Sequence, residues 1–177
     1  NSRKITGAIP EMLDEAERFV VQNTKTAVVI DENGQRSDRT EYPMRAIREA
    51  ILNALIHRDY SPYSESSPIR LEIYSDRIEI ASKGDIYGAV PVSALGQMEI
   101  GKRNAFLVDI LEAVHKTENR NSGILTMRTE CRKRNLPEPI FYCVHGEFKV
   151  VFKNSQPADN IVFDRTKAEK TILDFCE

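Results

Sequence analysis

Residues 43–60 read Pro43-Met44-Arg45-Ala46-Ile47-Arg48-Glu49-Ala50-Ile51-Leu52-Asn53-Ala54-Leu55-Ile56-His57-Arg58-Asp59-Tyr60. A proline at a first-turn position followed by a long run of good helix formers predicts a helix of about four turns. When successive residues are placed about 100° apart, one side of this helix is an apolar stripe formed by Ile47, Ile51, Ala54 and Leu55. The rest of the chain is expected to pack around that stripe.

A second row on the same helix is polar. Glu49, Asn53 and His57 follow each other at i, i+4 and i+8, and Leu52 and Ile56 flank them. Burying a carboxylate or an amide against apolar neighbours costs several kcal/mol unless it has a partner. A ligand or a metal could be that partner. A surface polar face with incidental apolar neighbours remains the alternative.

The sequence on either side of this helix alternates between helical and strand patterns. A helix is expected at 9–21, a hairpin at 26–40, a second hairpin at 69–81, helices at 104–114 and 123–134, and a closing hairpin at 139–152. Residues 82–103 lack periodicity and are punctuated by glycines, which predicts a mobile lid. On the helix at 104–114 the inner side is expected to be Phe106, Leu107, Ile110, Leu111 and Val114. This order predicts an α+β fold, a two-layer sandwich of a mixed sheet with helices on one face.

The composition narrows the class of protein. A chain of 177 residues with 41% apolar and 29% charged residues suits one ordinary globular domain. The formal net charge of −2 argues against nucleic-acid binding through bulk charge. Three cysteines without metal spacing point to reduced thiols. No apolar run approaches the ~18 residues of a membrane span, so a cytoplasmic location without membrane contact is expected.

The stretch from Arg48 to Tyr60 resembles the signature helix of bacterial RecG-like, Schlafen/AlbA-associated ATP-binding transcriptional regulators, a divergent branch of the GHKL ATPase superfamily. The resemblance extends from roughly Ile5 to Phe152. It implies a GHKL-like fold that binds ATP and Mg²⁺. In that superfamily a Glu-x-x-x-Asn helix carries the general base and the magnesium ligand, which implies Glu49 as base and Asn53 as metal ligand.

Three further stretches resemble family motifs. Ser82-Lys83-Gly84 stands where the family has Asn-Pro-Gly and the superfamily has an adenine-binding Asp-x-Gly, so the serine is a weaker partner for adenine. Gly101-Lys102-Arg103-Asn104 matches the segment after the lid, with Lys102 and Arg103 as phosphate contacts. Asn121-Ser122-Gly123 stands for the glycine box, and Gly123 opens a helix N-terminus that favours anions. The resemblance therefore implies a nucleotide site of Asn53, Ser82, Gly84, Lys102, Arg103, Asn104 and Gly123.

The domain organisation follows from the same patterns. Residues 1–153 are expected to form the ATP-binding domain, 154–165 a linker, and 166–177 the helical start of a C-terminal winged-helix segment. The resemblance implies DNA contact only through flanking domains, and a homodimer is left open. Two functions stay open at this stage. One is a Mg-dependent ATPase, and the other is a non-enzymatic interaction or dimerisation module that kept the fold and lost nucleotide.

Overall fold

A computed structural model describes residues 2–30, 33–88, 90–98, 100–113, 123–155 and 171–175. Six strands form one sheet with the order β1-β8-β4-β5-β7-β6. The strands are β1 Ser2–Ile5, β4 Ile69–Ile73, β5 Arg77–Lys83, β6 Ile140–Val144, β7 Glu147–Lys153 and β8 Thr171–Phe175. β1 is parallel to β8, and the other neighbouring pairs are antiparallel. The predicted mixed sheet is confirmed.

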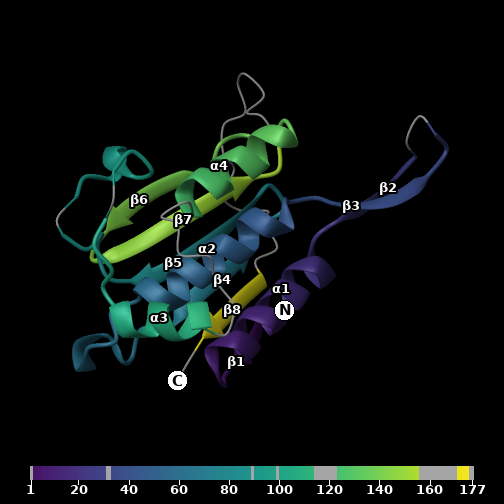
Figure 1. Cartoon of the computed structure of the whole chain (residues 1–177). Coiled ribbons are helices and arrows are strands. Elements are labelled where there is room, and N and C mark those ends of the chain that lie inside the picture. The colour runs from purple at the N-terminus through teal and green to yellow at the C-terminus, as the bar shows by residue number, and fades with distance from the viewer. Residues whose placement is uncertain are drawn as a thin grey trace.

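Helices cover one face of this sheet (Figure 1). They are α1 Ile9–Asn23, α2 Met44–His57, α3 Ala105–Ala113 and α4 Gly123–Lys133. α2 lies in the middle, where it contacts α1, α4 and β5. The predicted two-layer α+β sandwich, with helices on one face, is therefore confirmed. The hairpin of β2 Thr26–Ile30 and β3 Arg36–Thr40 forms a separate two-stranded sheet that projects from the body (Figure 1).

The core is built on the apolar stripe of α2. Ile47, Ile51 and Leu55 are at most 1% exposed, as the helical spacing predicted. On the sheet, every second residue of β5 turns toward the helices, so Ile78 and Ile80 complete the core from below. Burying this stripe fixes which way the polar row of α2 points.

We expect Leu55→Ala to lower the free energy of unfolding by about 2–5 kcal/mol, because it removes buried methyl groups and leaves a cavity between α2 and its neighbours. Urea denaturation would measure the change. Leu125→Ala on α4 is the matched control, since Leu125 is 57% exposed and a surface truncation costs about 0.5 kcal/mol or less. Equal losses in the two variants would contradict the placement of α2 at the centre of the core.

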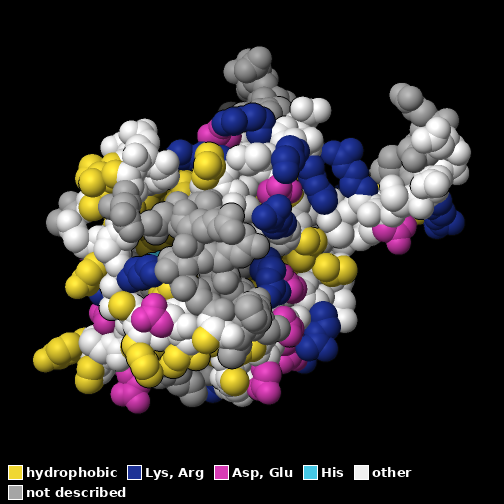
Figure 2. Space-filling view, in the orientation of Figure 1, with side chains coloured by type: hydrophobic (Ala, Val, Ile, Leu, Met, Phe, Trp, Pro, Cys, Tyr) yellow, Lys and Arg dark blue, Asp and Glu magenta, His cyan; other side chains and the backbone are white. Residues whose placement is uncertain are grey.

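The expectation for α3 is partly wrong. Leu111 is buried as predicted, but Phe106 is 79% and Ile110 is 44% exposed, while Val108 faces the core. Val114 lies outside the described residues. Nearly every residue of this helix is apolar, so the sequence contained little contrast from which to choose a side. Figure 2 shows the resulting apolar side chains along the lower rim of the molecule, where Figure 1 shows α3.

The helix expected within 166–177 is also wrong where the structure describes it. Residues Thr171–Phe175 form β8, between β1 and β4. The segment begins with two β-branched residues, which favour a strand. Pairing with β8 also satisfies backbone N–H and C=O groups of β4 that would otherwise be unpaired at an open sheet edge. The sequence patterns did not predict β1 at all. The division into a domain at 1–153, a linker at 154–165 and a further segment at 166–177 stays a prediction.

The loop between β5 and α3 is anchored to the core by a few apolar side chains, although many of its described residues are exposed. Leu95 is 4% exposed and belongs to the core. Gly96 has a φ of +79°, and an added Cβ there would lie 3.1 Å from Cγ2 of Ile124 on α4. The sequence did not predict these contacts, because isolated apolar side chains in an aperiodic segment give no signal of where they pack. The mobility of the loop as a whole stays a prediction.

Candidate functional site

A single pocket gathers most of the residues expected to act in nucleotide binding. Its floor is formed by β5 and β7, one wall by α2, the opposite wall by the loop 84–103, and its end by the start of α4. The lining includes Glu49, Asn53, Ser82, Gly84, Lys102, Arg103 and Gly123, but not Asn104. These residues come from four separate parts of the chain, and the fold brings them together.

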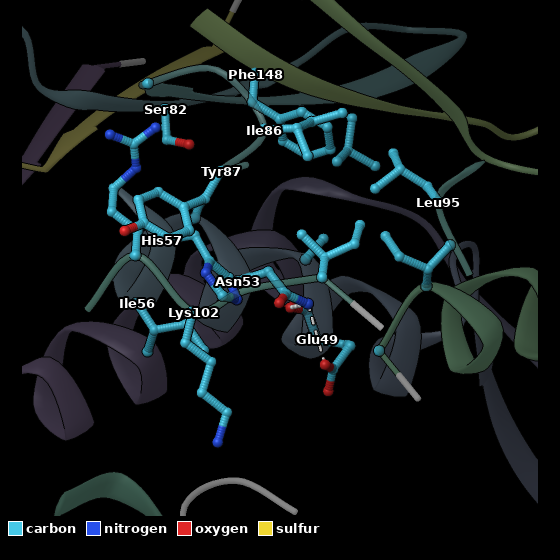
Figure 3. Close-up of a pocket in the computed structure, with 18 of the residues that line it drawn as sticks. Glu49, Asn53, Ile56, His57, Ser82, Ile86, Tyr87, Leu95, Lys102 and Phe148 are labelled. Atoms are coloured by element: carbon cyan, nitrogen blue, oxygen red, sulfur yellow. Dashed lines mark hydrogen bonds between the residues drawn. The ribbon is translucent and has the colours of Figure 1, made fainter. Parts of the chain in front are cut away.

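Glu49 and Asn53 form a hydrogen-bonded pair at one end of the pocket (Figure 3). Nδ2 of Asn53 donates to Oε1 of Glu49 over 3.0 Å and to the backbone carbonyl of Glu49 over 2.9 Å. Both bonds turn the nitrogen of the amide toward α2. Oδ1 of Asn53 accepts no hydrogen bond from the described residues, so this oxygen is the acceptor that remains for a ligand.

Gly123 closes over this pair. An added Cβ at Gly123 would lie 2.3 Å from Oε1 of Glu49 and 2.9 Å from Nδ2 of Asn53. Because this position carries no side chain, the first turn of α4 lies against the carboxylate and the amide in the positions that they take here, and a methyl group would displace the carboxylate. The backbone N–H groups of a helix start therefore lie next to the two side chains most suited to phosphate and metal chemistry.

Ser82 and Gly84 lie at the other end of the pocket. Ser82 is the last inward-facing residue of β5, is 5% exposed, and stands opposite Phe148 of β7. Gly84 has a φ of +113°, and an added Cβ would come within 3.3 Å of both Asp59 and the guanidinium of Arg103. The backbone can turn there only because this position is glycine.

Lys102 and Arg103 both line the pocket, but their side chains extend in different directions. The guanidinium of Arg103 donates from Nη2 to the backbone carbonyl of Asp85 over 2.7 Å and lies 5.6 Å from the ring centre of Tyr87. Figure 3 shows Tyr87 beside Ser82, away from Glu49, whereas Lys102 extends away from Ser82. The guanidinium of Arg103 therefore lies near Gly84, at the Ser82 end of the pocket, and its role as a phosphate contact stays a prediction.

Asn104 has a structural position. Its Nδ2 donates to the carbonyls of Ile56 and Arg58 over 2.8 and 2.9 Å, and its own carbonyl accepts the N–H of Val108 in α3. It thereby satisfies carbonyls at the C-terminal end of α2 and joins α2 to α3. The motif predicts this residue as part of the nucleotide site, and the structure uses it to hold the pocket's wall.

The sequence also suggests that His57, Arg58 and Asp59 fix the end of α2. The structure agrees for the last two: Arg58 donates to the carbonyls of Ser64 and Ser67, and the carboxylate of Asp59 accepts from Ser61 and Ser64. His57 instead lines the pocket. Burial lowers its pKa, and the charges of Arg103 and Lys102 lower it further, so the ring is neutral at pH 7. This position agrees with the row of Glu49, Asn53 and His57 that the helical spacing predicted on one side of α2.

The enclosed part of the cavity has the size of one flat ring system, about that of a nucleobase. Its volume is about 180 Å³, and a cavity of ~150 Å³ already holds a benzene ring. Apolar residues line its middle, including Ile80, Leu95, Met127 and Val150. No cluster of three or more His, Cys, Asp or Glu side chains suited to a metal occurs among the described residues. Magnesium fits because it retains several waters and needs few protein oxygens, such as Oδ1 of Asn53.

The chain is similar in sequence to one known family. Residues 66–152 match the family model described as "Putative ATP-dependent DNA helicase recG C-terminal". That match supports a RecG-related, ATPase-like domain. It includes Ser82, Gly84 and Gly123, while α2 with Glu49 and Asn53 lies outside the matched residues. No curated protein matches the chain in sequence.

Among solved structures, the DIP2311 protein from Corynebacterium diphtheriae is similar, with a TM-score of 0.69 and 22% sequence identity. The similarity covers 83% of this chain and 30% of the Corynebacterium chain. At this identity the comparison shows the fold alone. The chain thus spans less than a third of the length of that protein. In the described parts of the chain, no helix has the length and apolar content that crossing a membrane requires.

Proposed function

We propose that this domain binds a nucleoside triphosphate together with Mg²⁺ and hydrolyses it, with Glu49 as the general base. ATP is the nucleotide that the family match names. The observation that carries the proposal is the arrangement of Glu49, Asn53 and Gly123. A carboxylate and an amide oxygen line a pocket next to a helix start, and the glycine there lets the backbone of α4 lie close to both side chains.

Each residue of this end has a distinct role in the proposal. Oδ1 of Asn53 would hold the magnesium ion, which neutralises charge on the phosphate oxygens when bound. The hydrogen bond from Nδ2 of Asn53 keeps the Glu49 carboxylate oriented, so that it can accept a proton from an attacking water. Lys102 supplies a cation for the phosphates. The backbone at Gly123 supplies N–H donors.

A non-enzymatic module is the second candidate function. It is favoured by Ser82, because the position expected to hold a carboxylate for adenine is a small neutral side chain. Such a module would keep the same fold without binding nucleotide. Direct binding measurements separate the two candidates.

We expect nucleotide with Mg²⁺ to stabilise the domain by mass action, by about 2.7 kcal/mol at a hundredfold excess over the dissociation constant. Differential scanning calorimetry with millimolar ATP or GTP, each with Mg²⁺, would measure the rise in Tm. A matched series with EDTA tests whether the metal contributes. If neither nucleotide raises the Tm, the domain is the non-enzymatic module instead.

We further propose that the domain acts within a longer, cytoplasmic, DNA-binding transcriptional regulator. The support is the resemblance of residues 48–60 to such regulators and the match to a family named for a DNA helicase. The similar Corynebacterium chain, of which this chain covers 30%, shows that the same fold occurs within a longer chain. The net charge of −2 argues against DNA contact by these 177 residues themselves. DNA contact then falls to flanking domains, and the isolated 177 residues should show no sequence-selective DNA binding in an anisotropy titration. Homodimerisation would be tested in the same samples by sedimentation.

A further inference from the structure

The end of the pocket around Ser82 contains an arginine, Arg103, that the loop itself holds in place. Its Nη2 donates to the carbonyl of Asp85, and its guanidinium lies over the ring of Tyr87. Tyr87 is in turn held against Gly101, where an added Cβ would lie 3.1 Å from the ring. Tyr87 near the start of this loop and Arg103 at its end therefore contact each other. The contacts with Tyr87 and with the carbonyl of Asp85 fix the position of the guanidinium.

Arg103 has more donors than the protein uses. Its Nε is buried and has no hydrogen-bond partner among the described residues. A guanidinium carries five N–H donors and no acceptor. A ligand group that approaches Arg103 must therefore present hydrogen-bond acceptors. A ligand N–H at this position would face the N–H groups of Arg103 and could form no hydrogen bond with them.

No carboxylate offers an acceptor on the described floor of this end. Ser82 contributes a hydroxyl. Asp59, which packs near Gly84, has its carboxylate engaged by the N–H of Ser61 and the hydroxyl of Ser64. Asp85 also lines the pocket, but this residue is exposed to solvent, and its backbone carbonyl already accepts from Arg103. The buried part of this end, around Ser82 and the Arg103 guanidinium, is therefore rich in donors and poor in acceptors.

We propose that this pocket selects a 6-oxopurine nucleotide, with guanine or hypoxanthine as the base, over an adenine nucleotide. The inference rests on the proposed nucleotide binding and names the base. A guanidinium pairs with the O6 and N7 acceptors of guanine in a fork geometry. Adenine presents an amino group in place of O6, so its N–H would face the donors of Arg103. The ring of Tyr87 and the apolar lining can contact either purine equally well. The contact between Arg103 and the edge of the base is therefore the one that distinguishes guanine from adenine.

The test is isothermal titration of the chain with GTP, ITP, ATP and inorganic tripolyphosphate, each with Mg²⁺. GTP and ITP should bind at least about tenfold more tightly than ATP, as expected for one bidentate base contact. ITP lacks the 2-amino group of guanine, so equal preference for GTP and ITP would assign the discrimination to O6. Tripolyphosphate should bind more weakly than GTP.

Variants identify the residues that discriminate. Arg103→Leu should remove the preference for GTP while changing the affinity for ATP little. Arg45→Leu is the matched control, since the Arg45 side chain is 67% exposed and lies outside the pocket. Ser82→Asp should shift the preference toward ATP, because a carboxylate accepts from the adenine amino group. If Ser82→Asp prevents folding, Tyr87→Ala replaces it and should reduce the preference by releasing Arg103.

The outcomes separate the inference from the proposed function. If ATP binds as tightly as GTP or more tightly, nucleotide binding stands and the inference is wrong. The inference is also wrong if tripolyphosphate binds as tightly as GTP, because the base is then not read. If none of the four compounds binds, the proposed function and the inference both fail.

Discussion

Replacing Glu49 by glutamine should leave nucleotide binding nearly unchanged and lower turnover by about 10²–10⁴-fold, the usual contribution of a general base. Glutamine keeps the shape of the side chain and an oxygen that can accept the hydrogen bond from Nδ2 of Asn53. It removes only the ability to take a proton from water. Phosphate release under saturating Mg-nucleotide would measure turnover, and calorimetric titration would measure binding in the same preparation.

Two comparison variants make this result specific to Glu49. Glu65→Gln changes a carboxylate at an exposed position outside the pocket and should leave turnover unchanged. Asn53→Ala should instead weaken the magnesium dependence of binding, because the candidate metal ligand is removed. If Glu49→Gln and Asn53→Ala lower the Tm equally and leave turnover intact, the pair is structural and the proposed mechanism is wrong.

Gly123→Ala should reduce turnover by about 10²-fold or more while leaving the fold intact, since a displacement of about 1 Å at a catalytic group can cost that much in rate. The added methyl would meet Oε1 of Glu49 at 2.3 Å and Nδ2 of Asn53 at 2.9 Å. The contact with Glu49 involves the terminal atom of a flexible side chain, so the carboxylate moves and the helix does not. Alanine also favours helix more than glycine does, by up to about 1 kcal/mol.

Thermal unfolding and phosphate release, measured side by side, would test this separation of activity from stability. The double variant Gly123→Ala/Glu49→Ala supplies the control, because the methyl then meets no carboxylate. The double variant should bind nucleotide with the same affinity as Glu49→Ala alone. The effects of the two substitutions are then not additive, as expected for residues in contact. A large fall in Tm for Gly123→Ala alone would show that α4 itself cannot accept a side chain there.

Several parts of this protein can be predicted from sequence because the information is local. The apolar stripe of α2 repeats at helical spacing, so the spacing alone predicts Ile47, Ile51 and Leu55 as core residues, and their burial confirms it. Glycine at positions 84 and 123 marks places where the backbone turns or approaches closely. Where the local pattern lacks contrast, prediction fails, as for Phe106 and Ile110 on a helix that is apolar on nearly every side.

The amino-acid sequence by itself determined the helices and hairpins of the main body, the α+β class, and the row of Glu49, Asn53 and His57 on one side of α2. Only the tertiary structure decided that β8 lies between β1 and β4, that Asn104 supports α2 from outside the pocket, and that Arg103 lies at the Ser82 end. The physical reason is the distance along the chain over which each kind of interaction acts. Periodicity and turn chemistry act over a few residues, whereas strand order and the direction of a long side chain are set by partners far away in the chain.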